Sequence, residues 1–326
     1  NKEVGLCQKM KPELFFVGLL KEFFSRMNRN DLCWCGSGKK YKKCHEDFDE
    51  RIAEMKFDIF RGQVRPPKKI INNEKDIAGV RAAGVINDGA LDLMTEMVRP
   101  GIDTATLDQA AADYIRERGG IPACLNYEGY PKNVCISINE VVCHGIPNHK
   151  KLRDGDIINI DITVIKDGYH GDTSQMFWVG NPTPRNRQLC DMAQQTLYAA
   201  IRTVRPGACL SEIGAVIQPM AEKAGFSVVR DYCGHGLGKS FHEEPQVLHY
   251  RNNHKLTLKP GMCFTIEPMI NAGTYRCKVD RKDGWTVTTA DRQPSAQYEH
   301  TLLVTDEGCE VLTLRQDETL ERYIKA

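Results

Sequence analysis

The sequence lacks both a long hydrophobic run and a strong net charge. Its longest apolar run near the start, Leu14 to Leu20, is far shorter than the roughly 20 residues of a transmembrane helix. Charged Lys21 and Glu22 follow without a small-residue cleavage site, so we expect neither a membrane span nor a signal peptide. The net charge of +1 gives no overall argument for nucleic-acid binding.

A disulfide framework is also not indicated. The chain has 13 cysteines, an odd number, of which three share one short loop and the others are scattered singly. Scattered thiols in a chain of this size are typical of reduced core residues. We therefore expect a cytoplasmic protein.

The chain is long enough for one large domain and a small appendage. The segment RGQVRPPKK is basic, rich in proline and without apolar period, which indicates a linker. We expect an N-terminal extension (1–30), a cysteine-rich loop with a short helix (31–60), a linker (61–72), the main domain (73–318) and a C-terminal tail (319–326). Because the chain opens on Asn1 instead of Met, part of the extension is interpreted as foreign, with Met27 as an alternative start.

An internal repeat organises the main domain. Residues 98–120 and 204–226 align without gaps at an offset of 106, and each copy opens with Val-Arg-Pro-Gly. Helical stretches at 74–97 and 185–203 precede the two copies. Strand-like segments follow them: VCISINEVVC, DIINIDITVI, VLHY and MCFTIEPMI. The pattern predicts an α+β domain of two related halves, with helices outside an antiparallel sheet and a ligand site between the halves.

Two aspartates stand in a predicted β-hairpin, in the run NIDITVIKDGYHGDTS. If Asp167-Gly168 forms the two-residue turn, Asp161 faces Ser174 across the hairpin. Asp172 then shares the face of Asp161, about 7–8 Å away at Cα. Two like charges on one face repel unless a cation lies between them. Two exposed charges on a solvated sheet face are the alternative reading.

Three further potential ligands occupy strand-like positions. His235 lies between two glycines in CGHG, Glu267 interrupts the apolar run MCFTIEPM, and Glu299 precedes the strand-like HTLLVT. Taken singly, each is equally well read as a satisfied core residue. Taken together with the two aspartates, they form the donor set of a two-metal site. Oxygen-rich ligation with one imidazole favours manganese, iron, cobalt or zinc.

The motifs GDTSQMF, CGHG, FHEEP, FTIEP and YEHT, with NEVVCHG upstream, resemble the motif set of type I methionine aminopeptidases. The resemblance covers about residues 70–315 and implies the pita-bread fold and a metal-dependent hydrolase that removes N-terminal methionine before small second residues. It implies two divalent ions: Asp161 on one, His235 and Glu267 on the other, and Asp172 and Glu299 bridging both.

The same resemblance implies the other site roles. His144 and His242 contact the substrate peptide and the transition state. Apart from the resemblance, the chemistry of the site makes Glu267 a candidate proton shuttle to the leaving amine. The side chains that line the methionine pocket would be Tyr127, Tyr130, Cys135, Phe241 and Trp285. One departure is Glu128 in NYEGYP, where relatives often carry His or Asn, which leaves its role open.

The loop DLCWCGSGKKYKKCH contains Cys33, Cys35, Cys44 and His45. These residues at this spacing are typical of a closed structural zinc site. The loop resembles the zinc knuckle at the C-terminus of the SecA translocation ATPase, the SEC-C motif. Its surrounding lysines suggest docking to the ribosome, although a solvated basic loop is the simpler reading.

Other functions remain as alternatives. A proline-specific aminopeptidase shares the fold, but it normally carries a large N-terminal domain. A type II methionine aminopeptidase carries a helical insert between the motifs of His235 and Glu267, which are 32 positions apart here. A catalytically weak binding module would be expected to have lost ligands. We expect a monomer acting on nascent peptides.

Overall fold

A computed structural model describes residues 28–32, 39–43, 64–315 and 318. The chain divides into two compact units, Asn1–Val64 and Arg65–Ala326. In the first unit, a β-bridge joins Leu32 to Lys40 and the 3-10 turn η1 (Tyr41–Lys43) follows. The helix predicted within 46–60 and the four predicted zinc ligands lie outside the described residues. Among the helices that are described, none has the length and apolar character needed to cross a membrane.

The helices of the second unit start at residues that satisfy their free N–H groups. The Asn73 side chain accepts a hydrogen bond from Asp76 N, and Thr183 accepts one from Asn186 N, with Pro184 in the first turn. The helices are α3 (Glu74–Met97), α4 (Thr104–Glu117), α5 (Pro184–Ile201) and α6 (Ser211–Lys223). The predicted helix over 74–97 is confirmed, and the one over 185–203 differs by at most two residues at each end.

The strands of the second unit pair antiparallel throughout. One sheet has β1 (Ile121–Pro122), β4 (Ile157–Lys166) and β2 (Cys135–Ile138) in order, with β5 (Tyr169–Trp178) on β4. The largest sheet has the order β15 (Cys309–Val311), β14 (His300–Val304), β9 (Cys263–Ile266), β7 (Gly234–Gly236) and β8 (Glu243–Val247). Two three-stranded sheets consist of β13 (Ser295–Gln297), β10 (Met269–Asn271) and β6 (Ser227–Val228), and of β11 (Cys277–Val279), β12 (Val287–Thr289) and β3 (Val141–Cys143). Short 3-10 turns are η2 (Lys68–Ile70) and η3 (Tyr127–Gly129).

The predicted strand VLHY is wrong beyond its first residue. Strand β8 ends at Val247, and the following backbone leaves the sheet. The carbonyls of Leu248 and Tyr250 pack against Gly214 of α6, where a larger side chain would collide with them. Apolar composition alone could not distinguish this helix contact from a continued strand.

The internal repeat extends into the loops. Gly101 and Gly207, which are 106 residues apart, have φ of +88° and +82°, the left-handed conformation that glycine tolerates best. The amide of Gly101 donates to Leu152 O, and that of Gly207 donates to Leu258 O, again a pair at the same offset. The two halves therefore share hydrogen-bonding geometry as well as sequence, as predicted for a duplicated half-domain.

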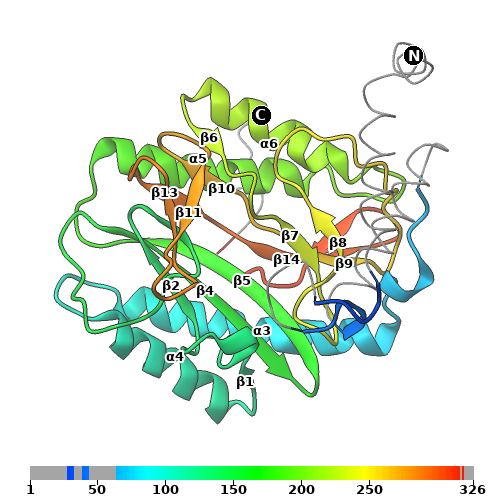
Figure 1. Cartoon of the computed structure of the whole chain (residues 1–326), viewed down its shortest axis with the longest axis horizontal. Helices are drawn as coiled ribbons and strands as arrows, with labels where there is room; N and C mark the ends of the chain where they lie inside the picture. The colour runs from blue at the N-terminus through cyan, green and yellow to red at the C-terminus, as the bar shows by residue number, and fades with distance from the viewer. Residues whose placement is uncertain (1–27, 33–38, 44–63, 316–317, 319–326) are drawn as a thin grey trace. The chain divides into compact units, whose positions relative to one another are not determined.

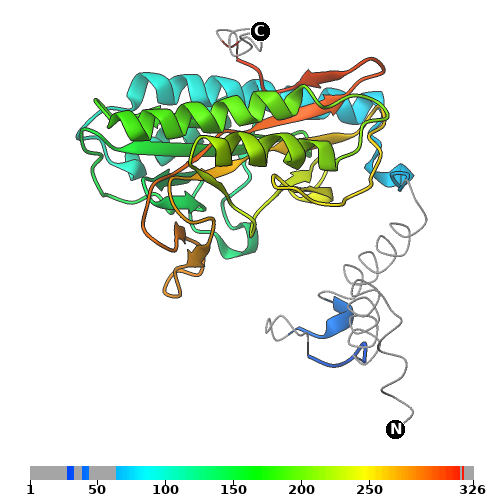
Figure 2. The same cartoon turned by 90° about the horizontal axis from the view of Figure 1, so that it is seen from above.

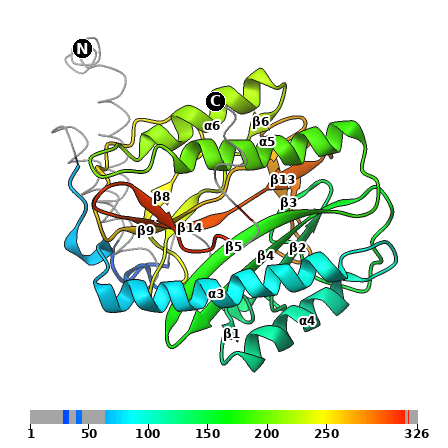
Figure 3. The same cartoon turned by 180° about the vertical axis from the view of Figure 1, so that it is seen from behind.

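Helices cover one face of the strands. Figure 3 shows α3 and α5 lying across the back of the sheets, and Figure 1 gives the opposite, strand-rich side. Seen from above in Figure 2, the helices gather on one side and the loop with β11 and β12 projects on the other. A large apolar core between α3, α4 and the β2, β4 and β5 strands includes Leu91, Met94 and Ile160. The helix layer thus supports the strands, and their other face carries the candidate site.

Candidate active site

The β4–β5 hairpin has the predicted register. Lys166 pairs with Tyr169 and Asp161 pairs with Ser174. The turn residues Asp167 and Gly168 have φ of +51° and +84°, as a type I′ turn requires. Asp172 pairs with Thr163, two residues from Asp161, so both carboxylates are on one face of the hairpin.

Segments far apart in the sequence bring further carboxylates to this face. Ligand atoms of Asp172, His235 and Glu299 all lie within 4.8 Å of one another, and all three residues are buried. Glu267, which directly follows β9, places Oε1 3.7 Å from Nε2 of His235. The structure therefore gathers the candidate ligands from β5, β7, the end of β9 and the start of β14.

His235 presents a lone pair to two carboxylates. Its Nδ1 lies 3.1 Å from the Gly236 carbonyl oxygen, which can only accept, so Nδ1 carries the proton. Burial lowers the pKa of His235 to about 3, so the ring is neutral and Nε2 has no proton. That nitrogen is 3.6 Å from Asp172 Oδ2 and 3.7 Å from Glu267 Oε1. Three acceptors facing one another fit a cation placed between them.

The carboxyl groups also disfavour one another's ionised forms. Burial, followed by the charges of Asp161 and Glu267, raises the pKa of Asp172 well above its usual value. Burial and then Asp172 raise that of Glu299 in the same way. Burial raises the pKa of Asp161 to about 7 and that of Glu267 to about 8. A bound divalent cation removes this mutual repulsion, so the donor set fits a divalent metal.

Neutral side chains orient the candidate ligands. Thr163 Oγ1 donates to Asp172 Oδ1 at 2.8 Å, and Thr265 Oγ1 donates to Glu267 Oε1 at 2.8 Å. Gln297 Nε2 donates to the other oxygen of Glu267 at 3.1 Å. Such outer partners fix the orientation of metal ligands. Sequence reasoning missed them, although Thr163 and Thr265 each lie two residues from a candidate ligand, where strand alternation places a side chain on the same face.

The five predicted pocket residues come together beside these carboxyl groups. Tyr130 and Cys135 belong to a buried apolar cluster against which Phe241 and Trp285 pack. The Tyr130 and Trp285 rings meet edge to face at 5.2 Å, and the Tyr127 ring lies 4.7 Å from that of Phe241. Aromatic edges around a thiol make an apolar, polarizable environment.

Sequence reasoning missed two members of this cluster, Cys124 and Ile146. Cys124 was counted among the scattered core thiols, because no pattern in its own segment links it to the site. Its Sγ lies 4.0 Å from Thr163 Oγ1, which ties the cluster to the hairpin. Glu128 is exposed and has a φ of +49°, a conformation uncommon for a residue other than glycine.

The two predicted non-ligand histidines flank the cluster. His144 has a φ of +55°, an uncommon backbone conformation at a functional position, and its ring packs edge-on against Trp285 at 5.9 Å. Burial lowers the pKa of His144. His242 lies 4.3 Å from the His235 ring, centre to centre, and its Nδ1 is 2.8 Å from the Tyr127 hydroxyl. His242 is solvent-accessible, yet desolvation and then His144 lower its pKa to about 4, so both rings are neutral near pH 7.

Comparison with known proteins agrees with this geometry. Residues 78–306 match the family model for metallopeptidase family M24, and residues 29–47 match the SEC-C motif. The methionine aminopeptidase of Escherichia coli (strain K12) is 58% identical over 257 residues, which is 78% of this chain and 97% of the relative. The crystal structure of methionine aminopeptidase from Rickettsia prowazekii has a TM-score of 0.74 at 51% identity, covering 75% of this chain and 99% of that one.

A more distant structure shares the fold alone. Prolidase from Pyrococcus furiosus has a TM-score of 0.61 at 21% identity, covering 76% of this chain and 66% of that one. The expected pita-bread architecture is thus shared with a prolidase of low sequence identity. High sequence identity to this chain, over nearly the full length of the relative, is found with the methionine aminopeptidases. The chain belongs to metallopeptidase family M24 and, within it, to the methionine aminopeptidases.

Proposed function

We propose that the site binds two divalent ions, drawn from cobalt, manganese, iron and zinc, and uses them to release N-terminal methionine from peptides. Asp161 would hold one ion, His235 and Glu267 the other, and Asp172 and Glu299 would bridge both. The observation that carries this proposal is the position of His235, whose Nε2 faces Asp172 Oδ2 and Glu267 Oε1 at 3.6 and 3.7 Å. When bound, such a metal pair supplies a hydroxide nucleophile near neutral pH.

The chain's own residues would position and stabilise the reacting peptide. The Tyr127 hydroxyl, 2.8 Å from Nδ1 of His242, can donate to that nitrogen and leave the ring proton on Nε2. His242 could then donate to the oxygen that becomes negative as the peptide carbonyl is attacked. His144 would bond the scissile amide, and Glu267 would pass a proton to the leaving amine.

Recognition of the first side chain would rest on the cluster of Tyr127, Tyr130, Cys135, Phe241 and Trp285. A methionine thioether packs well against aromatic edges, and the edge-to-face pair of Tyr130 and Trp285 provides them. We further propose that a small second residue is preferred. Two arms test this: Met-Ala and Met-Lys peptides should differ clearly in turnover, and equal rates would contradict the preference.

The metal assignment is tested by replacing one bridging candidate. Asp172→Ala should lose most bound metal and nearly all turnover while the apolar core keeps its fold, because two cations would remain with too few anions around them. Metal content, circular dichroism and peptide release are measured together. Asp191→Ala, at an exposed position of α5, is the matched control. Two retained metals with ordinary turnover in Asp172→Ala would contradict the assignment.

The N-terminal unit has a separate proposed role. We propose that Cys33, Cys35, Cys44 and His45 bind one structural zinc ion, and that the surrounding lysines dock the enzyme on the ribosome. The match of residues 29–47 to the SEC-C motif supports the zinc site. The described lysines, Lys39, Lys40, Lys42 and Lys43, flank the buried Tyr41, and this compact positive charge suits phosphate.

A further inference from the structure

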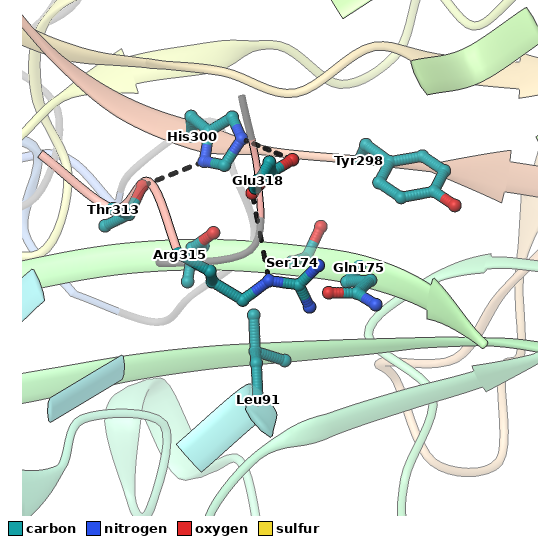
Figure 4. Close-up of a pocket in the computed structure, with 9 residues that line it drawn as sticks. Leu91, Ser174, Gln175, Tyr298, His300, Thr313, Arg315 and Glu318 are labelled. Carbon is teal, nitrogen blue, oxygen red and sulfur yellow. Dashed lines mark hydrogen bonds and ion pairs between the residues drawn. The ribbon is translucent and has the colours of Figure 1, made fainter. Parts of the chain in front are cut away.

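A buried polar cluster lies behind Glu299. Residues that follow one another in a strand point to opposite faces, so His300 points away from the candidate metal ligands toward the helix layer. Around it lie Thr313 and Glu318 from the segment after β15, as Figure 4 shows. These side chains line a cavity of about 10 Å³, the space of one water molecule at most. None of them takes part in the proposed reaction.

The described residues after β15 (312–315 and 318), called the C-terminal segment below, contact His300 from two sides. Nδ1 of His300 is 3.1 Å from Thr313 Oγ1, and Nε2 is 3.4 Å from Glu318 Oε1, with both side chains 6% exposed. Glu318 also pairs with Arg315, at 3.8 Å. Arg315 in turn lies 3.9 Å from Asp92 Oδ1 on α3. The segment is therefore held between β14 and α3 by polar and ionisable groups as well as by apolar packing.

Hydrogen bonds connect this cluster to two candidate ligands. Thr313 Oγ1 accepts from the amide of Thr301 at 3.0 Å, and the Thr301 hydroxyl donates to the carbonyl oxygen of Asp172 at 2.7 Å. On the other side of His300, the Glu299 amide donates to Ser174 O at 3.0 Å. The backbone from Glu299 to Thr301 is thus fixed to β5 on one side and to the C-terminal segment on the other.

Burying an imidazole and a carboxyl group beside a largely buried guanidinium is expensive compared with an apolar core of the same shape. What such a network provides is a single well-defined arrangement, since every polar partner must be met. Such an arrangement would fix the position of Glu299, which directly precedes β14, because small displacements of a ligand weaken metal binding.

We propose that Thr313 and Glu318 are positioning residues for the metal pair, which act through His300 and Thr301 on Glu299 and Asp172. They hold the start of β14 at the distance from β5 at which these two carboxylates can bridge the same ions. The inference rests on the proposed assignment of Asp172 and Glu299 as bridging ligands.

The test compares Thr313→Val, which removes the hydroxyl at nearly constant shape, with Thr313→Ser, which keeps it. Metal-free full-length protein is titrated with Mn²⁺ by calorimetry, and the spin-coupled manganese pair is followed by electron paramagnetic resonance. Thr313→Val should bind the second Mn²⁺ about 10–100-fold more weakly and show less coupled signal, with KM for a Met-Ala peptide unchanged at saturating Mn²⁺. Thr313→Ser should behave as wild type.

Glu318→Ala provides an independent arm, since it removes the other contact to His300, and it should give the same loss of affinity. Thr305→Val, in the turn between β14 and β15 where Thr305 Oγ1 accepts from Gly308 N, is the matched control and should bind Mn²⁺ normally. Wild-type affinity in both Thr313→Val and Glu318→Ala, even with a lowered Tm, would show that the segment is only structural and overturn the proposal. If Glu299→Ala itself keeps both ions, the ligand assignment fails and the proposal with it.

Discussion

Thr163 lies directly opposite Asp172 across the β4–β5 hairpin, and its hydroxyl donates a 2.8 Å hydrogen bond to Oδ1 of that carboxylate. Both side chains are almost fully buried. One oxygen of Asp172 is therefore occupied by a neutral donor, and the other, Oδ2, faces His235 at 3.6 Å. The pairing orients the carboxylate without adding charge to the site.

Thr163→Val should accordingly weaken metal binding by about 10–100-fold without removing any ligand. The change keeps the side-chain shape but leaves Asp172 Oδ1 without this donor. Metal affinity measured by titration of the metal-free protein checks it. Thr95→Val, which removes a hydroxyl that donates to Leu91 O within α3, is the matched control. Equal metal affinity in the two variants would contradict the orienting role.

His144→Ala should leave metal content intact and slow turnover by about 10²–10⁴-fold, because a hydrogen-bonding partner of the reacting peptide is lost. The check is metal analysis together with kcat on a short Met-Ala peptide. The contrast with Asp172→Ala separates the two roles. Loss of metal from His144→Ala would place that histidine among the ligands instead.

The hairpin register was predictable because three local rules agree: turn residues with positive φ, two-residue loop length and strand alternation. Asp161 and Asp172 could therefore be placed on one face from the sequence alone. The partners Gln297 and Thr301 could not be placed in this way. Gln297 bonds to Glu267 from 30 residues away and Thr301 bonds to the backbone of Asp172 from 129 residues away, and no local spacing indicates either contact. The strand predicted at VLHY was wrong beyond its first residue for a similar reason, since the backbone of Leu248 and Tyr250 packs against Gly214 of α6, a contact that the segment's own composition does not indicate.

Peptides that begin with Met should be cleaved faster than their Leu counterparts by a free-energy difference of about 1–3 kcal/mol. Leucine fills an apolar site of this size but lacks the sulfur that packs on the edges of Tyr130 and Trp285. The measurement is kcat/KM for Met-Ala and Leu-Ala peptides of equal length. Trp285→Ala should reduce the preference, and an unchanged ratio in that variant would argue against contact between Trp285 and the substrate.

The contribution of Asp88 to the stability of the fold should decrease as pH rises from about 4 to about 8. Burial, and then the nearby Asp92 and Glu318, raise the pKa of Asp88 to about 8, and its Oδ1 is buried without a hydrogen-bond partner among the described atoms. In this window the folded protein holds a proton on Asp88 that the unfolded chain has released, so the contribution of this group to the free energy of unfolding falls as pH rises. Asp88→Asn should remove this contribution, so the variant should gain stability relative to wild type as pH rises, measured by urea unfolding at several pH values. Asp113→Asn, at an exposed position of α4, is the control and should leave the slope as it is.

Removal of residues 1–69 should leave cleavage of short peptides close to normal. Every residue proposed for the active site lies in the second compact unit, and the contacts of Ile71 and Asn72 with Met262 and Gly261 are retained. The Escherichia coli relative supports this, because 97% of its length is matched by 257 residues of this chain. Peptidase assays on the truncated and full-length proteins check it, and a large loss of activity would make the N-terminal unit part of the enzyme's fold.

Binding to ribosomes should, by contrast, depend on the N-terminal unit. Lys39, Lys40, Lys42 and Lys43 would act by releasing counterions from phosphate, so binding should weaken steeply with added salt. Cys44→Ser should mimic the truncation, because a structural zinc loop loses its fold together with its metal. Cys309→Ser, a cysteine change in the second unit, is the matched control and should bind as wild type. Co-sedimentation of the four proteins with ribosomes at several salt concentrations decides the matter: if the truncated and Cys44→Ser forms pellet as well as the full-length protein, docking does not depend on the knuckle.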